Sequence, residues 1–77
     1  MLSYVENQTY FLSMEMYCDG NCIIILRKKI DENHGKRIYE HVCKPHTEND
    51  DFAIYYDLKE RIENNTLNDE YVANLKR

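Results

Sequence analysis

The sequence predicts an α+β fold, in which a three-stranded antiparallel β-meander packs against one amphipathic C-terminal helix that is followed by a second short helix. Residues 9 to 44 hold segments with the period-two alternation of strands, whereas residues 47 to 76 carry apolar residues at helical spacing. A chain of 77 residues is too short to divide its apolar side chains between two cores. We therefore expect residues 1 to 77 to form a single domain.

The first predicted element is a β-hairpin over residues 9 to 30. From Tyr10 to Cys18 the apolar side chains occupy every second position, which is typical of a strand with one buried face. Asp19-Gly20-Asn21 predicts a turn, because Asp-Gly tolerates the positive φ angles of tight hairpins. The β-branched run from Cys22 to Ile30 predicts the returning strand.

A third strand is predicted from Lys36 to Cys43, after a polar loop that ends at Gly35. Its alternation divides the side chains between two faces, with Ile38, Glu40 and Val42 on one and Tyr39, His41 and Cys43 on the other. Charged side chains within a strand are typical of a sheet edge, where they hinder pairing with another chain. We therefore expect this strand to lie at an edge.

The first helix is predicted from a capping signature and an apolar stripe. Pro45 ends the sheet because it lacks the N–H that a ladder needs, and Thr47-Glu48-Asn49-Asp50 resembles a capping box. A period of 3.6 residues aligns the apolar side chains Phe52, Ile54, Tyr55, Leu58 and Ile62. The acidic residues Asp50, Asp57 and Glu60 are expected on the opposite side, and the helix should end near Glu63.

The second helix is predicted to be shorter. Asn64-Asn65 breaks the first helix, and the pattern Thr66-x-x-Asp69 repeats the capping signature. The helix that follows would place Leu67, Tyr71 and Leu75 on one line.

The charge of the chain bears on its surroundings. The formal net charge is −4, and residues 47 to 77 hold the whole excess, with eight acidic residues against four basic ones. This surface lacks the positive field that a phosphate backbone requires, so we expect no direct nucleic-acid binding.

The N-terminus has neither the basic nor the apolar region of a signal peptide, and the longest apolar run, Cys22 to Leu26, is far shorter than a membrane span. We expect a cytoplasmic protein without membrane contact.

Four residues form a candidate metal site: Cys18, Cys22, Cys43 and His46. The predicted meander brings the end of the first strand, the start of the second and the end of the third to one end of the sheet. Thiolates and an imidazole are the ligands of a closed tetrahedral zinc site, whose binding energy would stabilise a thin core. The alternative is that the cysteines pack as small apolar side chains and the protein has no cofactor.

No residue pattern predicts an enzyme. His41 and Cys43 would share a strand face, but nothing marks an oxyanion hole or an orienting carboxylate beside them. The only glycines, Gly20 and Gly35, lie in separate turns, so no glycine-rich loop could cradle a phosphate. We therefore expect a non-catalytic protein.

Two kinds of side chain form a candidate contact surface. The seven tyrosines exceed what a small core can bury, and Tyr17 and Tyr56 are predicted to face outward, as tyrosines of binding interfaces do. A row of helical carboxylates could imitate a row of phosphates and attract a basic groove: Asp50, Asp57, Glu60 and Glu63.

The resulting hypothesis is a small acidic regulator or inhibitor that binds a larger host protein, such as a nucleic-acid-handling enzyme. The abundance of Asn, Lys, Ile and Tyr indicates an AT-rich genome, so a phage or another mobile element is a plausible source. Two alternatives stay open. One is a small zinc-stabilised structural module, and the other is a homodimer in which the third strand or the tyrosines pair with a second copy.

Overall fold

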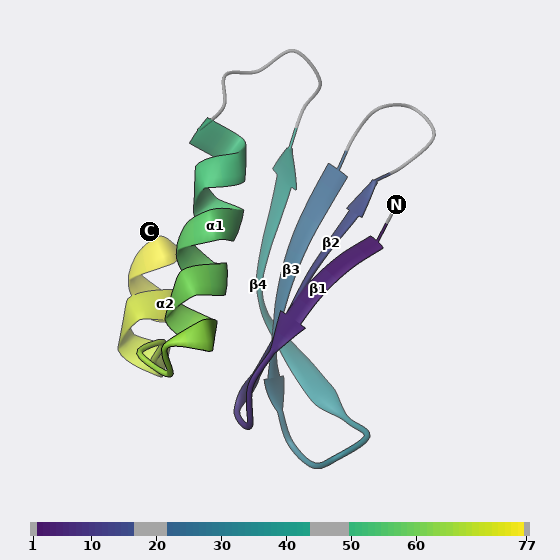
Figure 1. Cartoon of the computed structure of the whole chain (residues 1–77), viewed down its shortest axis with the longest axis vertical. Coiled ribbons are helices and arrows are strands. Elements are labelled where there is room, and N and C mark those ends of the chain that lie inside the picture. The colour runs from purple at the N-terminus through teal and green to yellow at the C-terminus, as the bar shows by residue number, and fades with distance from the viewer. Residues whose placement is uncertain (1, 17–21, 44–49, 77) are drawn as a thin grey trace.

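Four antiparallel strands form one sheet, in the order β1-β2-β3-β4. The computed structural model describes residues 2–16, 22–43 and 50–76. Its elements are β1 (Leu2–Glu6), β2 (Tyr10–Met16), β3 (Cys22–Lys29), β4 (Gly35–Cys43), α1 (Asp50–Glu63) and α2 (Asp69–Leu75). Both helices lie on the same side of the sheet (Figure 1). The predicted α+β class, the hairpin of β2 and β3 and the edge position of β4 are therefore confirmed.

The predicted number of strands is wrong, because the sheet has a fourth strand at its other edge. β1 pairs with β2 from Leu2 opposite Glu15 to Glu6 opposite Phe11. The turn between them contains no glycine or proline; instead, the Asn7 side-chain oxygen accepts the backbone N–H groups of Thr9 at 2.8 Å and Tyr10 at 2.7 Å. A side chain that closes a turn in this way leaves a weaker sequence signal than Asp-Gly does.

One expectation for β4 is also wrong. The register between β3 and β4 shifts between Leu26 and Arg27, so that Leu26 pairs with Tyr39 and Arg27 pairs with Arg37. This irregularity turns Ile38 toward the core beside Tyr39, rather than onto the face of Glu40 and Val42.

The core lies between the sheet and the helices. Its fully buried side chains come from β2, β3 and α1: Leu12, Ile24, Leu26, Leu58 and Ile62. Tyr55 is buried with them, which confirms the predicted stripe of α1 at the positions whose side chains are described. In α2 the buried residue is Val72, while Tyr71 and Leu75 pack at the margin of the core.

Polar contacts fix the helices to the sheet. The Tyr10 hydroxyl donates to Asp69 at the start of α2 over 2.6 Å, and the Lys28 ammonium group lies 2.5 Å from the other oxygen of that carboxylate. The Asn7 amide donates to the backbone oxygen of Ile62 over 3.2 Å. The end of α1 and the start of α2 are thus each held by side chains from the sheet side of the chain.

The cap of α2 differs from the expected one. The N-cap is Asn68, whose side chain accepts the Tyr71 N–H at 2.8 Å, and not Thr66. Thr66 instead donates to the backbone oxygen of Arg61. The predicted turn at residues 19 to 21 and the predicted capping box at residues 47 to 49 lie outside the described residues. Neither α1 nor α2 has the length and apolar character needed to cross a membrane.

Candidate functional site

The outer side of α1 carries the first candidate surface. Ala53, Tyr56, Glu60 and Glu63 are all exposed, and their spacing of three and four residues places them on one line along the helix. Tyr56 is 61% exposed, and its ring meets the buried ring of Tyr55 edge-on with centroids 5.7 Å apart. We call Tyr56, Glu60 and Glu63 the α1 stripe. Within the described part of the chain, neither glutamate side chain forms an ion pair.

The pKa of Tyr55, the buried tyrosine beside Tyr56, is changed by its surroundings. Burial raises the pKa of Tyr55 above its usual value, and the neighbouring Tyr56 and Glu63 act in the same direction. The neutral hydroxyl of Tyr55 therefore stays protonated under physiological conditions. The ring of Tyr56 thus packs against an uncharged aromatic ring.

Asp57 does not lie opposite the core, as the helical pattern suggested, but turns sideways toward α2. Its carboxylate accepts the hydroxyl of Tyr71 and the Arg61 Nε–H, the latter at 3.3 Å. The Arg61 guanidinium also lies 3.9 Å from the centroid of the Tyr71 ring. The hydrogen bond to Asp57 raises the pKa of Tyr71. These contacts join the two helices, so the carboxylate of Asp57 is occupied within the chain.

The side chains of the two remaining candidate contact residues, Tyr17 and Asp50, are not described by the structure. Tyr17 lies outside the described residues, and the structure describes the backbone of Asp50 at the start of α1 but not its side chain. The structure therefore brings together Tyr56, Glu60 and Glu63 of the predicted set.

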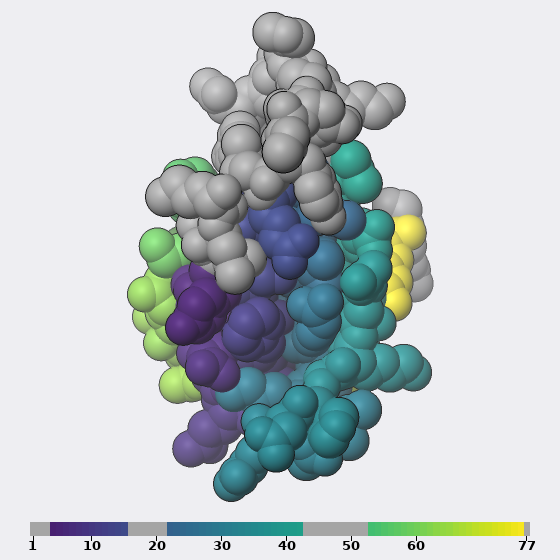
Figure 2. Space-filling view, turned by 90° about the vertical axis from the view of Figure 1, so that its right-hand side faces the viewer, coloured from purple at the N-terminus to yellow at the C-terminus, as the bar shows by residue number. Residues whose placement is uncertain are grey.

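The second candidate surface is the sheet face turned away from the helices, shown in Figure 2. Because side chains alternate along a strand, the neighbours of the buried Leu12 and Ile24 point to this open face. The strand register arranges its positions in three rows: Leu2, Glu15, Ile23 and Val42; Tyr4, Ser13, Ile25 and Glu40; Glu6, Phe11, Arg27 and Arg37. We call this set the open face; the side chain of Leu2 is not described.

The open face carries more apolar groups than a solvent-facing sheet usually does. Tyr4 is 59% exposed and Val42 is 51% exposed. The Tyr4 ring stacks on that of Phe11, with centroids 5.4 Å apart. Ile25 is only 3% exposed although neither helix lies on its side of the sheet. Beside it, the Ser13 hydroxyl is buried without a hydrogen-bond partner among residues 2–16, 22–43 and 50–76.

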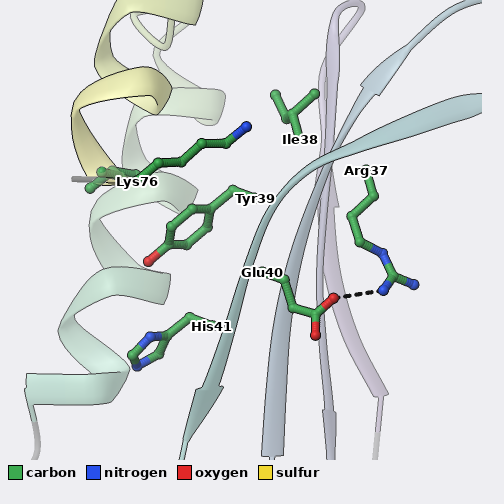
Figure 3. Close-up of a pocket in the computed structure, with 7 residues that line it drawn as sticks. Arg37, Ile38, Tyr39, Glu40, His41 and Lys76 are labelled. Atoms are coloured by element: carbon green, nitrogen blue, oxygen red, sulfur yellow. Dashed lines mark hydrogen bonds and ion pairs between the residues drawn. The ribbon is translucent and has the colours of Figure 1, made fainter.

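Ion pairs line the lower end of this face. Lys29 lies 2.6 Å from Glu6, which joins β3 to the edge strand β1. Arg37 donates to Glu40 over 2.6 Å along β4, and Figure 3 shows both side chains on the side away from the helices, with Tyr39 and His41 on the helix side. Exposed pairs of this kind contribute little to stability.

A hollow of about 490 Å³ lies between β4 and the end of α2. Its walls are formed by Arg37, Ile38, Tyr39, Glu40, His41, Leu75 and Lys76. The hollow opens broadly to solvent, and none of these side chains is a serine, threonine or cysteine nucleophile. The groove carries apolar, aromatic and charged side chains.

The structure describes two of the four positions of the predicted metal site. The register places Cys22 of β3 directly opposite Cys43 of β4, and Cys22 is a buried free thiol. Cys18 and His46 lie outside the described residues. Among residues 2–16, 22–43 and 50–76, no three side chains of metal-ligating type form a group. Cys22 and Cys43 are therefore register partners on adjacent strands, and the full set of four is an open hypothesis.

Comparisons with family models, curated proteins and solved structures give no match to this chain. The two surfaces are therefore the features that bear on function. The residues of the α1 stripe were predicted from the sequence as contact residues, whereas the open face was not. The signal was the run Ile23-Ile24-Ile25-Leu26, since consecutive apolar residues place apolar side chains on both faces of a strand.

Proposed function

We propose that this chain is a small acidic regulator or inhibitor that binds a larger protein through the α1 stripe. The observation that carries the proposal is the exposure of Tyr56 on the same helical line as Glu60 and Glu63. An exposed tyrosine contributes a large, rigid contact area at low entropic cost, and flanking charges select the partner. The protein acts by occupying a surface of its partner and not by catalysis.

The charge of the stripe specifies the chemistry of the partner. The excess of acidic residues lies in residues 47 to 77, which include both helices. A surface of this sign is attracted to basic grooves, and such grooves occur on enzymes that handle nucleic acids. Binding there would exclude the nucleic acid by imitating its charge. A cytoplasmic protein encoded by a phage or mobile element, as the composition indicates, would meet such enzymes in its host.

The test is affinity purification from the cells in which the protein occurs. We expect a companion protein that co-purifies in a fixed ratio with the tagged wild type and is lost from the double variant Tyr56→Ser/Glu60→Lys. The control is Glu32→Lys, which changes the charge by the same amount as Glu60→Lys, at an exposed position in the loop between β3 and β4. The control should retain the companion.

Two results would contradict the proposal. If neither the wild type nor the control brings down a companion, protein binding of this kind is wrong. If the double variant retains the companion as well as the control does, binding does not use the α1 stripe. The activity of the purified companion, measured with and without the wild-type chain, then tests whether the interaction inhibits it.

The opposed positions of Cys22 and Cys43 support a second candidate, a zinc-stabilised structural module. Cys18 and His46 would complete the ligand set. Mass spectrometry of protein purified without chelator should then find about one zinc per chain, and Cys22→Ser should abolish it. A wild-type zinc content no higher than that of Cys22→Ser contradicts this candidate.

A further inference from the structure

The open face has the composition of a buried surface but no covering layer among the described elements. Ile25 and Ser13 lie at its centre, at 3% and 2% exposure, and the apolar side chains of Tyr4 and Val42 remain half exposed at its two edges. An antiparallel sheet that faces water usually presents polar side chains there. Ile25 and Ser13 are already buried within the chain, so the apolar area that a second layer can remove from water lies at Tyr4 and Val42.

The charges of the open face are arranged unevenly. The first row is apolar apart from Glu15, whereas the third row carries Glu6 at the β1 edge, Arg27 at its centre and Arg37 at the β4 edge. The acidic and basic ends of this row thus lie at opposite edges of the sheet. A partner that fits it must present an arginine over β1 and a carboxylate over β4.

A second copy of the same chain meets this requirement. When two open faces stack about a two-fold axis that runs along the strands, each row lies on its own equivalent and the edges exchange, so that β1 covers β4 of the second copy. Glu6 then faces Arg37 of the second copy, and Phe11 faces its Arg27. In the first row, Ile23 of each copy faces Glu15 of the other, so this carboxylate lies within the interface.

The other simple stacking arrangement does not fit. A two-fold axis across the strands would place the apolar first row of one copy on the charged third row of the other. It would set Arg27 on Ile23 and Arg37 on Val42 of the second copy, and Glu40 on its own equivalent. The axis along the strands sets fewer charges against apolar groups, because it pairs Arg37 with a carboxylate. The arrangement of charges therefore selects the axis along the strands.

We propose that two copies of this chain associate through their open faces and form a two-layered β-sandwich, with Glu6 of each copy paired with Arg37 of the other. Sheets that pack in this way lie about 10 Å apart. Each copy already holds the pairs Lys29–Glu6 and Arg37–Glu40, so association joins them into a row of alternating charge at each edge. The α1 stripes stay on the outside, because α1 covers the other side of the sheet (Figure 1). This association does not depend on the function proposed for the α1 stripe.

The first test is sedimentation equilibrium over a roughly hundredfold range of concentration. The mass should rise from the 9.3 kDa of one chain toward twice that value. Val42→Glu places a carboxylate in the apolar first row, where it is exposed in a single copy but buried in the pair, and should weaken association at least about tenfold. Glu60→Lys on the α1 stripe is the control and should leave association unchanged. Circular dichroism checks that both variants are folded.

The second test is a charge exchange between Glu6 and Arg37. Within one copy these residues lie on the two edge strands, three strand spacings or about 14 Å apart, where solvent and salt screen their interaction. Glu6→Arg and Arg37→Glu should each weaken association about fivefold, because each variant sets like charges against one another across the interface. The double variant should restore it.

Three results would overturn the proposal. A chain that remains at 9.3 kDa at the highest concentration does not associate in this way. An association that Val42→Glu leaves unchanged uses another surface. A double charge variant that associates no better than the weaker single variant excludes the predicted pairing of Glu6 with Arg37.

Discussion

The two faces of the sheet are made from the same strands, but the helices pack on only one of them (Figure 1). On the helix side, Leu12, Ile24 and Leu26 are fully buried, and Tyr10 is hydrogen-bonded to Asp69 of α2. On the open face the hydroxyl of Ser13 is buried without a partner, and Val42 is half exposed. Two short helices cover one face only. We therefore expect the helix side to supply most of the stability, and the open face to contribute less.

The largest expected effect on stability is a difference between two substitutions in β3, one on each face of the sheet. Leu26→Ala removes a fully buried side chain from the helix side of β3 and should lower the free energy of unfolding by about 3 kcal/mol. Ile23→Ala, on the open face of the same strand, should cost about 1 kcal/mol or less, because Ile23 is only half-buried. Urea unfolding at the lowest usable protein concentration, where copies are separate, measures both.

Equal losses in these two variants would contradict the distinction between a covered and an open face. A chain of this size has a total stability of roughly 4 to 12 kcal/mol. If Leu26→Ala proves too unstable to study, Leu26→Val is the matched alternative. Its loss should still exceed that of Ile23→Val.

The second prediction concerns the contact between Tyr10 and α2. Tyr10→Phe keeps the buried ring and removes the hydroxyl that donates to Asp69, so it should cost about 1 kcal/mol at neutral pH. Burial, together with the hydrogen bond to Asp69, raises the pKa of Tyr10 from 10.0 to about 12. Since the unfolded chain releases this proton more easily, the contribution is complete below pH 10 and is lost as the pH rises from about 10 to 12.

Chemical unfolding at a series of alkaline pH values checks this behaviour. The difference in stability between the wild type and Tyr10→Phe should shrink above pH 10. Tyr55 and Tyr71 remain in both proteins, so their titration cancels in the comparison. A difference that stays constant up to pH 12 would show that the hydroxyl of Tyr10 is not buried against α2.

The third prediction concerns Asp69, the carboxylate that accepts the Tyr10 hydroxyl, and its titration at low pH. The hydrogen bond from Lys28, followed by that from Tyr10, lowers the pKa of Asp69 below its usual 3.8. Because the folded state holds the proton less tightly, the stabilisation is present above pH 3.8 and is lost as the pH falls through the lower pKa of the folded state. Asp69→Asn should therefore lower the melting temperature at pH 7, and the difference from the wild type should disappear in strong acid. A difference that persists there would contradict the role assigned to this carboxylate.

The sequence predicted those parts of the fold that depend on local periodicity. Alternation from Tyr10 onward and the β-branched run that follows predicted the β2–β3 hairpin, and helical spacing predicted the buried face of α1 at Tyr55, Leu58 and Ile62. It failed where a distant contact decides the outcome. β1 depends on a turn closed by the side chain of Asn7, and the position of Ile38 depends on a register shift against β3.

The same division applies to the candidate sites. The exposure of Tyr56, Glu60 and Glu63 follows from the helical period and was predicted. The occupation of Asp57 by Tyr71 and Arg61 requires the packing of α2 on α1, which periodicity cannot show. The open face was missed because a three-stranded sheet contains neither Tyr4 nor its stacking on Phe11.

The smallest expected effect concerns Ser13 and has the opposite sign. Its buried hydroxyl has lost its contacts with water and has gained no hydrogen bond in return. Ser13→Ala removes that uncompensated group and leaves a side chain of similar size, so it should raise the free energy of unfolding by about 0.5 kcal/mol. Thermal and urea unfolding of the two proteins measure the gain, with Thr9→Ala at an exposed position as the control. A loss of stability in Ser13→Ala would mean that the hydroxyl has a partner in solution. The open face would then be a hydrated surface, and not one that gains from being covered.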